Sequence, residues 1–224
     1  MSAIGYPRTK ATEIPTPRVS AATAKAAAMA VGPVLVTAGY ALHPTGDEKG
    51  VAFARNVAEH TGSWAVAHLL IAGGLAVLAA ALPSVLRLAP ARGRRLVFTG
   101  AVLTTIGAAG MALDAIAHGY LAYTLASAPH VNAVAAASID THAASSTWAS
   151  MMSLMGIAFP FGLITTAVGC ARAGVPKPIA ALLVVGVMGI GAAGAGPLTL
   201  ITSAPLVAGF IALARMTARE RVPA

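Results

Sequence analysis

The chain has 224 residues, of which 57% are hydrophobic and only 10% are charged, and its mean hydropathy is +0.78. About a quarter of the residues of a typical soluble domain are charged, so this composition excludes that class and predicts an integral membrane protein. The single cysteine, Cys170, excludes an intramolecular disulfide and a zinc site built from paired cysteines.

Six apolar stretches are expected to form transmembrane helices in an all-α bundle, because each approaches the roughly 20 residues that cross a bilayer. In chain order they are residues 26–42, 63–88, 96–125, 148–171, 179–195 and 198–214. The domain is expected to span residues 21–216, with cytoplasmic tails at 1–20 and 217–224. The first tail is polar and rich in proline, which predicts flexibility.

The connections between the spans are expected to be polar loops, the longest being residues 43–62 and 127–147. Trp64 and Trp148 open the second and fourth spans, where an indole is favoured at the boundary between lipid and water. The prolines at 176 and 178 and the Gly196-Pro197 pair are typical of turns between helices.

The basic residues are distributed unequally between the two membrane sides that six spans define. With both termini in the cytoplasm, thirteen of the 15 lysines and arginines fall on the cytoplasmic side, and only Lys49 and Arg55 fall outside. Cytoplasmic loops carry an excess of Lys and Arg, so this bias predicts that orientation. We therefore expect a multi-pass protein of the cell (plasma) membrane. The same distribution accounts for the net charge of +8 and favours no nucleic-acid partner.

The histidines collect on the opposite, outer side of this topology. All of them fall at or near the outer ends of the predicted helices, at His43, His60, His68, His118, His130 and His142. The cytoplasmic halves of the spans carry hydroxyl side chains but no acid or histidine. Any chemistry is therefore expected to face outward, with His43, His60 and His130 as solvated loop residues.

Asp114 and His118 stand four residues apart in an apolar span, which places both side chains on one helix face. Ionisable residues inside a membrane are unfavourable, so such a pair marks a candidate functional site. At 1.5 Å per residue, Asp114 lies about 27 Å along the helix from Leu96, beneath the outer edge of a core about 30 Å thick. His68 is expected at a similar depth on the second span.

Two imidazoles and a carboxylate suit Zn²⁺ or Fe²⁺, so His68, Asp114 and His118 are candidate metal ligands, with His142 as a fourth. Asp114 is also the candidate catalytic residue, acting as a ligand or as an orienting base. Alternatively, His68 and His118 are the axial ligands of a haem. A structural role is the remaining alternative, in which Asp114 bonds His118, His68 bonds a neighbouring carbonyl, and Asp140 and His142 cap the fourth span.

Three functions remain open. The first is a metal- or haem-dependent membrane enzyme or redox protein that uses the outward-facing site. The second is a structural or accessory subunit that packs against a membrane-protein partner, or against another copy of itself, through its small residues. The third is a small-solute transporter, which ranks last because the titratable groups lie near one surface rather than at the midplane. These residues name no reaction or substrate.

Glycine is frequent in two of the predicted spans. Gly100, Gly107 and Gly110 belong to the third span, and the fifth contains Gly186, Gly189, Gly191 and Gly194. Small residues let helix backbones approach closely in membranes, and glycines can also mark an unwound ligand-binding segment. We favour close packing, because no charged residue accompanies the glycines of the fifth span.

Two short stretches carry a resemblance. They are H-P-T-G-D-E-K-G at residues 43–50 and H-T-G-S-W-A-V-A-H-L-L at residues 60–70. Together they resemble uncharacterised bacterial six-helix membrane families, in which a loop with proline and aspartate precedes a helix with histidine. The resemblance covers about 30 residues and implies a six-helix fold without a settled activity.

Overall fold

The computed structural model describes residues 21–46, 49–127 and 133–219, and this part of the chain is helical without any strand. The helices are α1 (Ala21–Leu42), α2 (Gly50–Glu59), α3 (Thr61–Ala81), the 3-10 helix η1 (Leu82–Leu88), α4 (Arg94–Ala126), α5 (Ala133–Ala144), α6 (Ser146–Ala173), α7 (Lys177–Ala193), α8 (Leu198–Thr202) and α9 (Ala204–Arg219). Of the predicted tails at 1–20 and 217–224, residues 1–20 and 220–224 lie outside the described residues, and residues 217–219 belong to α9.

Four helical segments are long and apolar enough to cross a membrane. They are Thr23–Leu42, Thr61–Leu88, Arg94–Ala126 and Thr147–Ala173, and they match the first four predicted spans. The fifth predicted span forms α7, an apolar helix of only 17 residues. The sixth is divided into α8 and α9, because Pro205 has no N–H to donate and its ring disturbs the preceding turn.

The two long connections are not simple loops, and in this respect the sequence prediction was wrong. Each contains a helix, α2 in the first connection and α5 in the second. In α2 the buried side chains of Phe53, Ala54 and Val57 lie three and four residues apart, which is the spacing of one helix face. The charged residues between them conceal this pattern when the segment is read as a whole.

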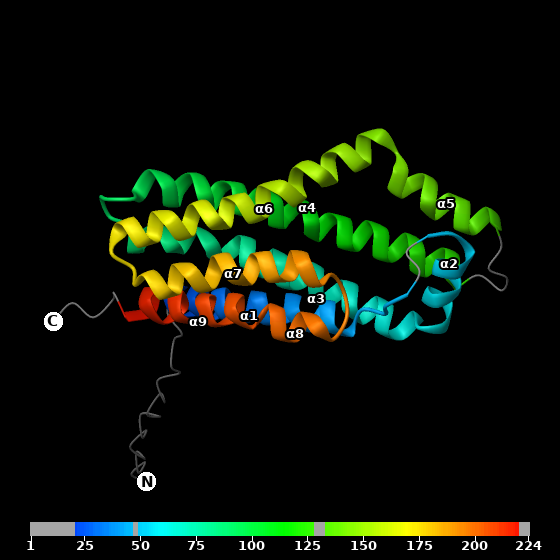
Figure 1. Cartoon of the computed structure of the whole chain (residues 1–224), viewed down its shortest axis with the longest axis horizontal. Helices are drawn as coiled ribbons and strands as arrows, with labels where there is room; N and C mark the ends of the chain where they lie inside the picture. The colour runs from blue at the N-terminus through cyan, green and yellow to red at the C-terminus, as the bar shows by residue number, and fades with distance from the viewer. Residues whose placement is uncertain (1–20, 47–48, 128–132, 220–224) are drawn as a thin grey trace, which may run out of the picture.

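The long helices run side by side, and the turns place the basic residues at one end (Figure 1). This basic end comprises Lys25, Arg87, Arg92, Arg94, Arg95, Arg172, Lys177, Arg215 and Arg219. The opposite end carries α2 and α5, which pack against each other and against α4. We call α2, α5 and the adjoining ends of α3 and α4 the cap.

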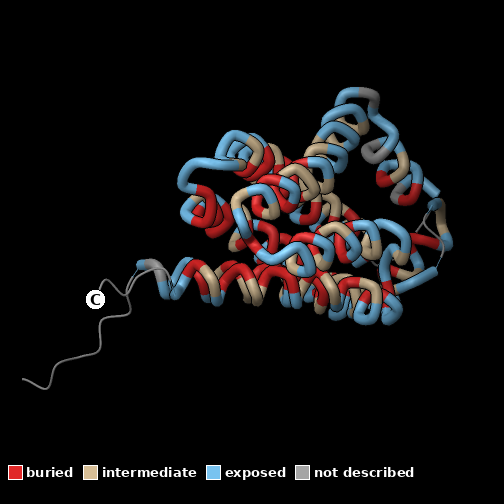
Figure 2. The backbone as a smooth tube through the Cα atoms, turned by 60° about the vertical axis from the view of Figure 1, so that its left-hand side comes forward, coloured by how far each residue is buried: buried red, intermediate tan, exposed pale blue. Residues whose placement is uncertain are grey.

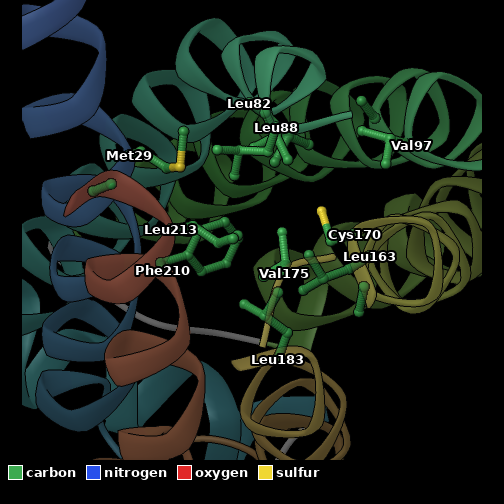
Figure 3. Close-up of a cluster of buried hydrophobic side chains, with 14 of the residues drawn as sticks. Met29, Leu82, Leu88, Val97, Leu163, Cys170, Val175, Leu183, Phe210 and Leu213 are labelled. Atoms are coloured by element: carbon green, nitrogen blue, oxygen red, sulfur yellow. The ribbon is translucent and has the colours of Figure 1, made fainter. Parts of the chain in front are cut away.

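The buried side chains form three clusters along the bundle, and buried positions face the neighbouring helices (Figure 2). The largest, at the basic end, joins Met29, Leu82, Leu163, Leu183 and Phe210 from five different segments (Figure 3). A middle cluster surrounds Leu75, and a third lies in the cap. Buried contacts between helices therefore occur at the basic end, in the middle of the bundle and in the cap.

Glycine residues let the backbone of α4 pack directly against the backbone of α6. A Cβ atom at Gly100 would collide with the backbone of Thr166, and one at Gly107 would collide with the backbone of Phe159. Gly186 of α7 lies in the same way against Leu206 of α9. Between membrane helices, such contacts provide van der Waals packing where the hydrophobic effect does not operate. The favoured interpretation, close packing, describes these positions, whereas Gly191 and Gly194 have open space beside them.

We expect Gly107→Ala to lower the free energy of unfolding by about 1–3 kcal/mol, because the methyl group has to displace the Phe159 backbone. The measurement is thermal or denaturant unfolding of the purified protein in mild detergent. Gly73→Ala is the matched control, since Gly73 is also a mid-helix glycine but has nothing within 4 Å of its Cβ position. Equal stability of the two variants would contradict the packing role of Gly107.

Candidate functional site

The candidate site lies in the cap, where the ends of α1 and α4, the beginning of α3 and the helix α2 meet. Its floor is the cap cluster of buried residues, which includes Phe53, Val57, Trp64, Ala122 and Ile139. Around this floor, one tryptophan, one phenylalanine and three histidines come into ring contact. We call Phe53, Trp64, His43, His68 and His118 the ring cluster.

Trp64 is the centre of the ring cluster. Its side chain is only 1% exposed, and its Nε1 donates a hydrogen bond of 3.1 Å to the Gly119 carbonyl of α4. The sequence predicted an interfacial indole at this position, and the structure buries the indole among residues of α2, α4 and α5 in the cap cluster. The indole therefore joins α3 to α4 within a buried core.

His68 lies one helical turn after Trp64, and the two rings are tilted against each other with centroids 4.3 Å apart. Its Nδ1 is 2.9 Å from the Trp64 carbonyl oxygen, and a carbonyl can only accept, so Nδ1 carries the proton. The ring also lies against Gly119, where a Cβ atom would come within 2.6 Å of it. Glycine at this position provides the space that the imidazole occupies.

His43 joins the ring cluster from the end of α1. Its ring centroid is 4.6 Å from that of Trp64 and 5.0 Å from that of His68, so the expectation of a solvated loop residue was wrong. Its Nδ1 donates to the Pro44 carbonyl at 2.9 Å. Burial lowers the pKa of His43 below the ordinary value of 6.5, although the bond to Pro44 acts in the opposite direction. The ring is therefore neutral at pH 7, with its lone pair on Nε2.

His118 completes the ring cluster, with its ring centroid 6.4 Å from His68, 6.2 Å from Trp64 and 6.1 Å from Phe53. The expected approach of His68 to His118 is thus present. Asp114 is held differently, because its Oδ1 accepts a hydrogen bond of 3.2 Å from Trp148 Nε1. This bond connects α4 to the beginning of α6.

The second pair of candidates belongs to α5. Asp140 accepts hydrogen bonds from the Gly50 backbone N–H at 3.2 and 3.3 Å, so its carboxylate stabilises the first turn of α2 rather than α6. The side chain of His142 lies outside the described residues. His60 is exposed, as expected of a solvated residue, and His130 is outside the described part of the chain.

The metal and haem hypotheses can be compared with this geometry. Among the described residues, no three side chains of His, Cys, Asp or Glu gather closely enough to hold a metal ion. A haem held between His68 and His118 would need the space beside both rings. The indole of Trp64 lies there, 4.3 Å from one ring and 6.2 Å from the other. The ring cluster is therefore packed as a set of aromatic contacts.

The ring cluster borders an open pocket of about 480 Å³. His43, Phe53, Trp64 and His118 line one part of it, and residues 193–195 at the end of α7 line another. Asn56 and the segment 44–46 contribute polar atoms. This volume falls within the usual range for small-molecule sites, about 300–1,000 Å³, and the mixture of ring faces with a few polar groups is typical of them. We call this the ring pocket.

Sequence reasoning missed four residues of the site, namely His43, Phe53, Trp64 and Gly119. The four-residue spacing of Trp64 and His68 was a usable signal, because it places both rings on one face of α3. The positions of His43 and Gly119 depend on how α1 and α4 pack against α3, which no local pattern reveals.

Comparison with protein-family models, curated proteins and solved structures finds no match to this chain. The resemblance to uncharacterised six-helix bacterial families therefore stays a prediction.

We expect the protein to lose stability as the pH falls below 6.5. Because burial lowers the pKa of His43, the unfolded state binds more protons than the folded state below that value. The midpoint of thermal unfolding should decline with pH less steeply in His43→Gln than in the wild type. His60→Gln, which changes an exposed ring, should follow the wild type, and identical slopes in all three proteins would contradict this origin.

Proposed function

We propose that this chain is a six-span integral protein of the cell membrane that binds a neutral, hydroxyl-bearing ring compound in the outward-facing ring pocket. The observation that carries the proposal is the open pocket of about 480 Å³ bordered by His43, Trp64 and His118, where His43 Nδ1 donates to the Pro44 carbonyl. The proposed function is the binding of this compound.

The basic end supports the topology. Nine described lysines and arginines lie there, against Lys49 and Arg55 near the cap, which is the distribution that keeps the basic end in the cytoplasm. The segment α8–α9 and the 17-residue α7 form the last two crossings in this proposal. Their shortness is compatible with local thinning of the bilayer or with interfacial residues at their ends.

The hydrogen-bonding state of His43 supports the ligand chemistry. Since Nδ1 donates to Pro44, Nε2 can only accept while the ring is neutral. A complementary ligand therefore donates a hydrogen bond, as a hydroxyl group does. The ring faces of Phe53 and Trp64 favour an aromatic or other flat ring beside that hydroxyl.

We favour ligand binding in the ring pocket over the metal- or haem-dependent enzyme expected from the sequence. Asp114 is engaged with Trp148 and does not border the ring pocket. We expect the purified protein to contain zinc and iron well below one equivalent and to lack a Soret band. Stoichiometric metal that disappears in both His68→Ala and His118→Ala would restore the earlier hypothesis.

The topology is tested with single cysteines in a Cys170→Ala background. A membrane-impermeant thiol reagent added to intact cells should label Thr45→Cys and Glu59→Cys, both exposed in the cap. It should label Arg92→Cys and Arg219→Cys, exposed at the basic end, only after the membrane is opened. The reverse pattern would overturn the orientation, and labelling of both groups from outside would overturn the crossing itself.

Ligand binding is tested with 4-methylphenol, which has a hydroxyl donor, and with 4-methylanisole, in which a methyl group replaces the donated proton. The readout is Trp64 fluorescence in the Trp148→Phe variant, which leaves one of the two tryptophans. The phenol should bind more tightly, and His43→Phe should weaken it about five- to tenfold, as for the loss of one hydrogen bond.

His60→Phe is the matched control for this measurement, because His60 is exposed and does not border the ring pocket. It should leave the affinity for 4-methylphenol unchanged. Equal affinities for the phenol and the ether, or equal effects of the two substitutions, would contradict the donor–acceptor recognition at His43.

A further inference from the structure

A second, larger cavity lies inside the bundle between the ring pocket and the basic end. Its volume is about 670 Å³, and α1, α3, α4, α6 and α7 contribute to its walls. Its lining is almost entirely apolar and includes Pro33, Leu75, Phe159, Pro160 and Val187, with Tyr40 as the polar exception. A cavity of this size with apolar walls suits a hydrocarbon chain rather than water.

The apolar cavity adjoins the ring pocket. Gly194 borders both spaces, and Tyr40 of the cavity stands three residues before His43 of the ring pocket, about one turn along the end of α1. The backbone N–H of Gly196 donates to the Tyr40 carbonyl at 2.8 Å, which fixes the turn after α7 against this junction. A polar compartment with ring faces is thus stacked on an apolar one.

The apolar cavity reaches the lipid-facing surface of the bundle. Met188 lines it and is 60% exposed, and the lining glycines Gly156 and Gly191 are exposed as well. These residues come from α6 and α7, which lie close near their connecting turn and diverge towards the cap (Figure 1). The opening between α6 and α7 gives a membrane-dissolved molecule a lateral entrance.

No lysine, arginine, aspartate or glutamate lines either space in the described part of the chain. A phosphate head would therefore have no cation to neutralise it, whereas a neutral head has no such requirement. A plain hydrocarbon would leave the polar atoms of the ring pocket without a partner.

We propose that the ligand is a neutral lipid, with a hydroxyl-bearing ring in the ring pocket and an apolar chain in the cavity between α6 and α7. This inference rests on the function proposed above and adds the substrate class and the route of entry. The chain enters from the bilayer, and the head then meets His43 and Trp64 at the outer end of the same path.

The test compares 4-decylphenol, which has both head and chain, with 4-methylphenol, which has the head alone. Both are titrated into protein in lipid nanodiscs, again with Trp64 as the only tryptophan. Gly191→Leu fills the cavity, because a Cβ at Gly191 has open space and the position lines the wall. Gly73→Leu is the matched control, since Gly73 also has open space but does not line the cavity.

Gly191→Leu should lower the affinity for 4-decylphenol at least tenfold and leave the affinity for 4-methylphenol unchanged. Gly73→Leu should change neither affinity. Because both variants experience the same partitioning of the probe into lipid, their ratio reports the cavity alone. Replacing 4-decylphenol by 4-decylanisole should lose the additional affinity that depends on the hydroxyl group.

Three outcomes would overturn the inference, and they can be told apart. If 4-methylphenol binds through His43 but Gly191→Leu does not affect 4-decylphenol, the ring pocket stands and the chain does not use the cavity. If neither phenol binds, the proposed function and the lipid inference both fail. Tighter binding of an anionic single-chain phospholipid than of 4-decylphenol would contradict the proposal that the head group of the ligand is neutral.

Discussion

The structure depends on backbone-to-backbone approach at the glycines of α4. In a bilayer, lipid tails are as apolar as leucine, so helices associate only where their surfaces fit closely. Gly100 and Gly107 provide that fit against α6, and Gly119 provides it against His68 of α3. A single helix thus holds two neighbours, one on the side of the basic end and one at the cap.

The ring cluster follows from this arrangement. Once Gly119 admits the His68 ring, its carbonyl is also within reach of Trp64 Nε1, and the indole becomes fixed between two helices. His43 arrives from α1, which packs along α3. Each histidine of α1 and α3 uses Nδ1 for a nearby carbonyl, so the local backbone determines which nitrogen remains as an acceptor.

Long apolar stretches can be predicted from the sequence, whereas contacts between distant segments cannot. The lengths of the first four spans and the clustering of basic residues were predictable because each depends on local composition. The site was predictable only in part. His68 and His118 were placed at one depth by counting residues, and their rings lie near each other, whereas the hydrogen bond from Trp148 of α6 to Asp114 was not predicted. The partner of a side chain depends on its rotamer and on the helices packed beside it. Helical spacing determines neither of these.

Because α4 has a fixed length, the thickness of the bilayer affects how deep the ring pocket lies in the membrane. From Arg94 to His118 the helix rises 24 residues, or about 36 Å at 1.5 Å per residue, against a hydrocarbon core of about 30 Å. If the arginines are held among the inner headgroups, as in the proposed topology, His118 would stand a few ångströms above the core in an average membrane. A thicker, sterol-like membrane would draw the ring pocket down into the interfacial layer, and a thinner one would lift it into water. Lipid composition would then regulate how much water surrounds the polar compartment, without any change in the protein's own contacts.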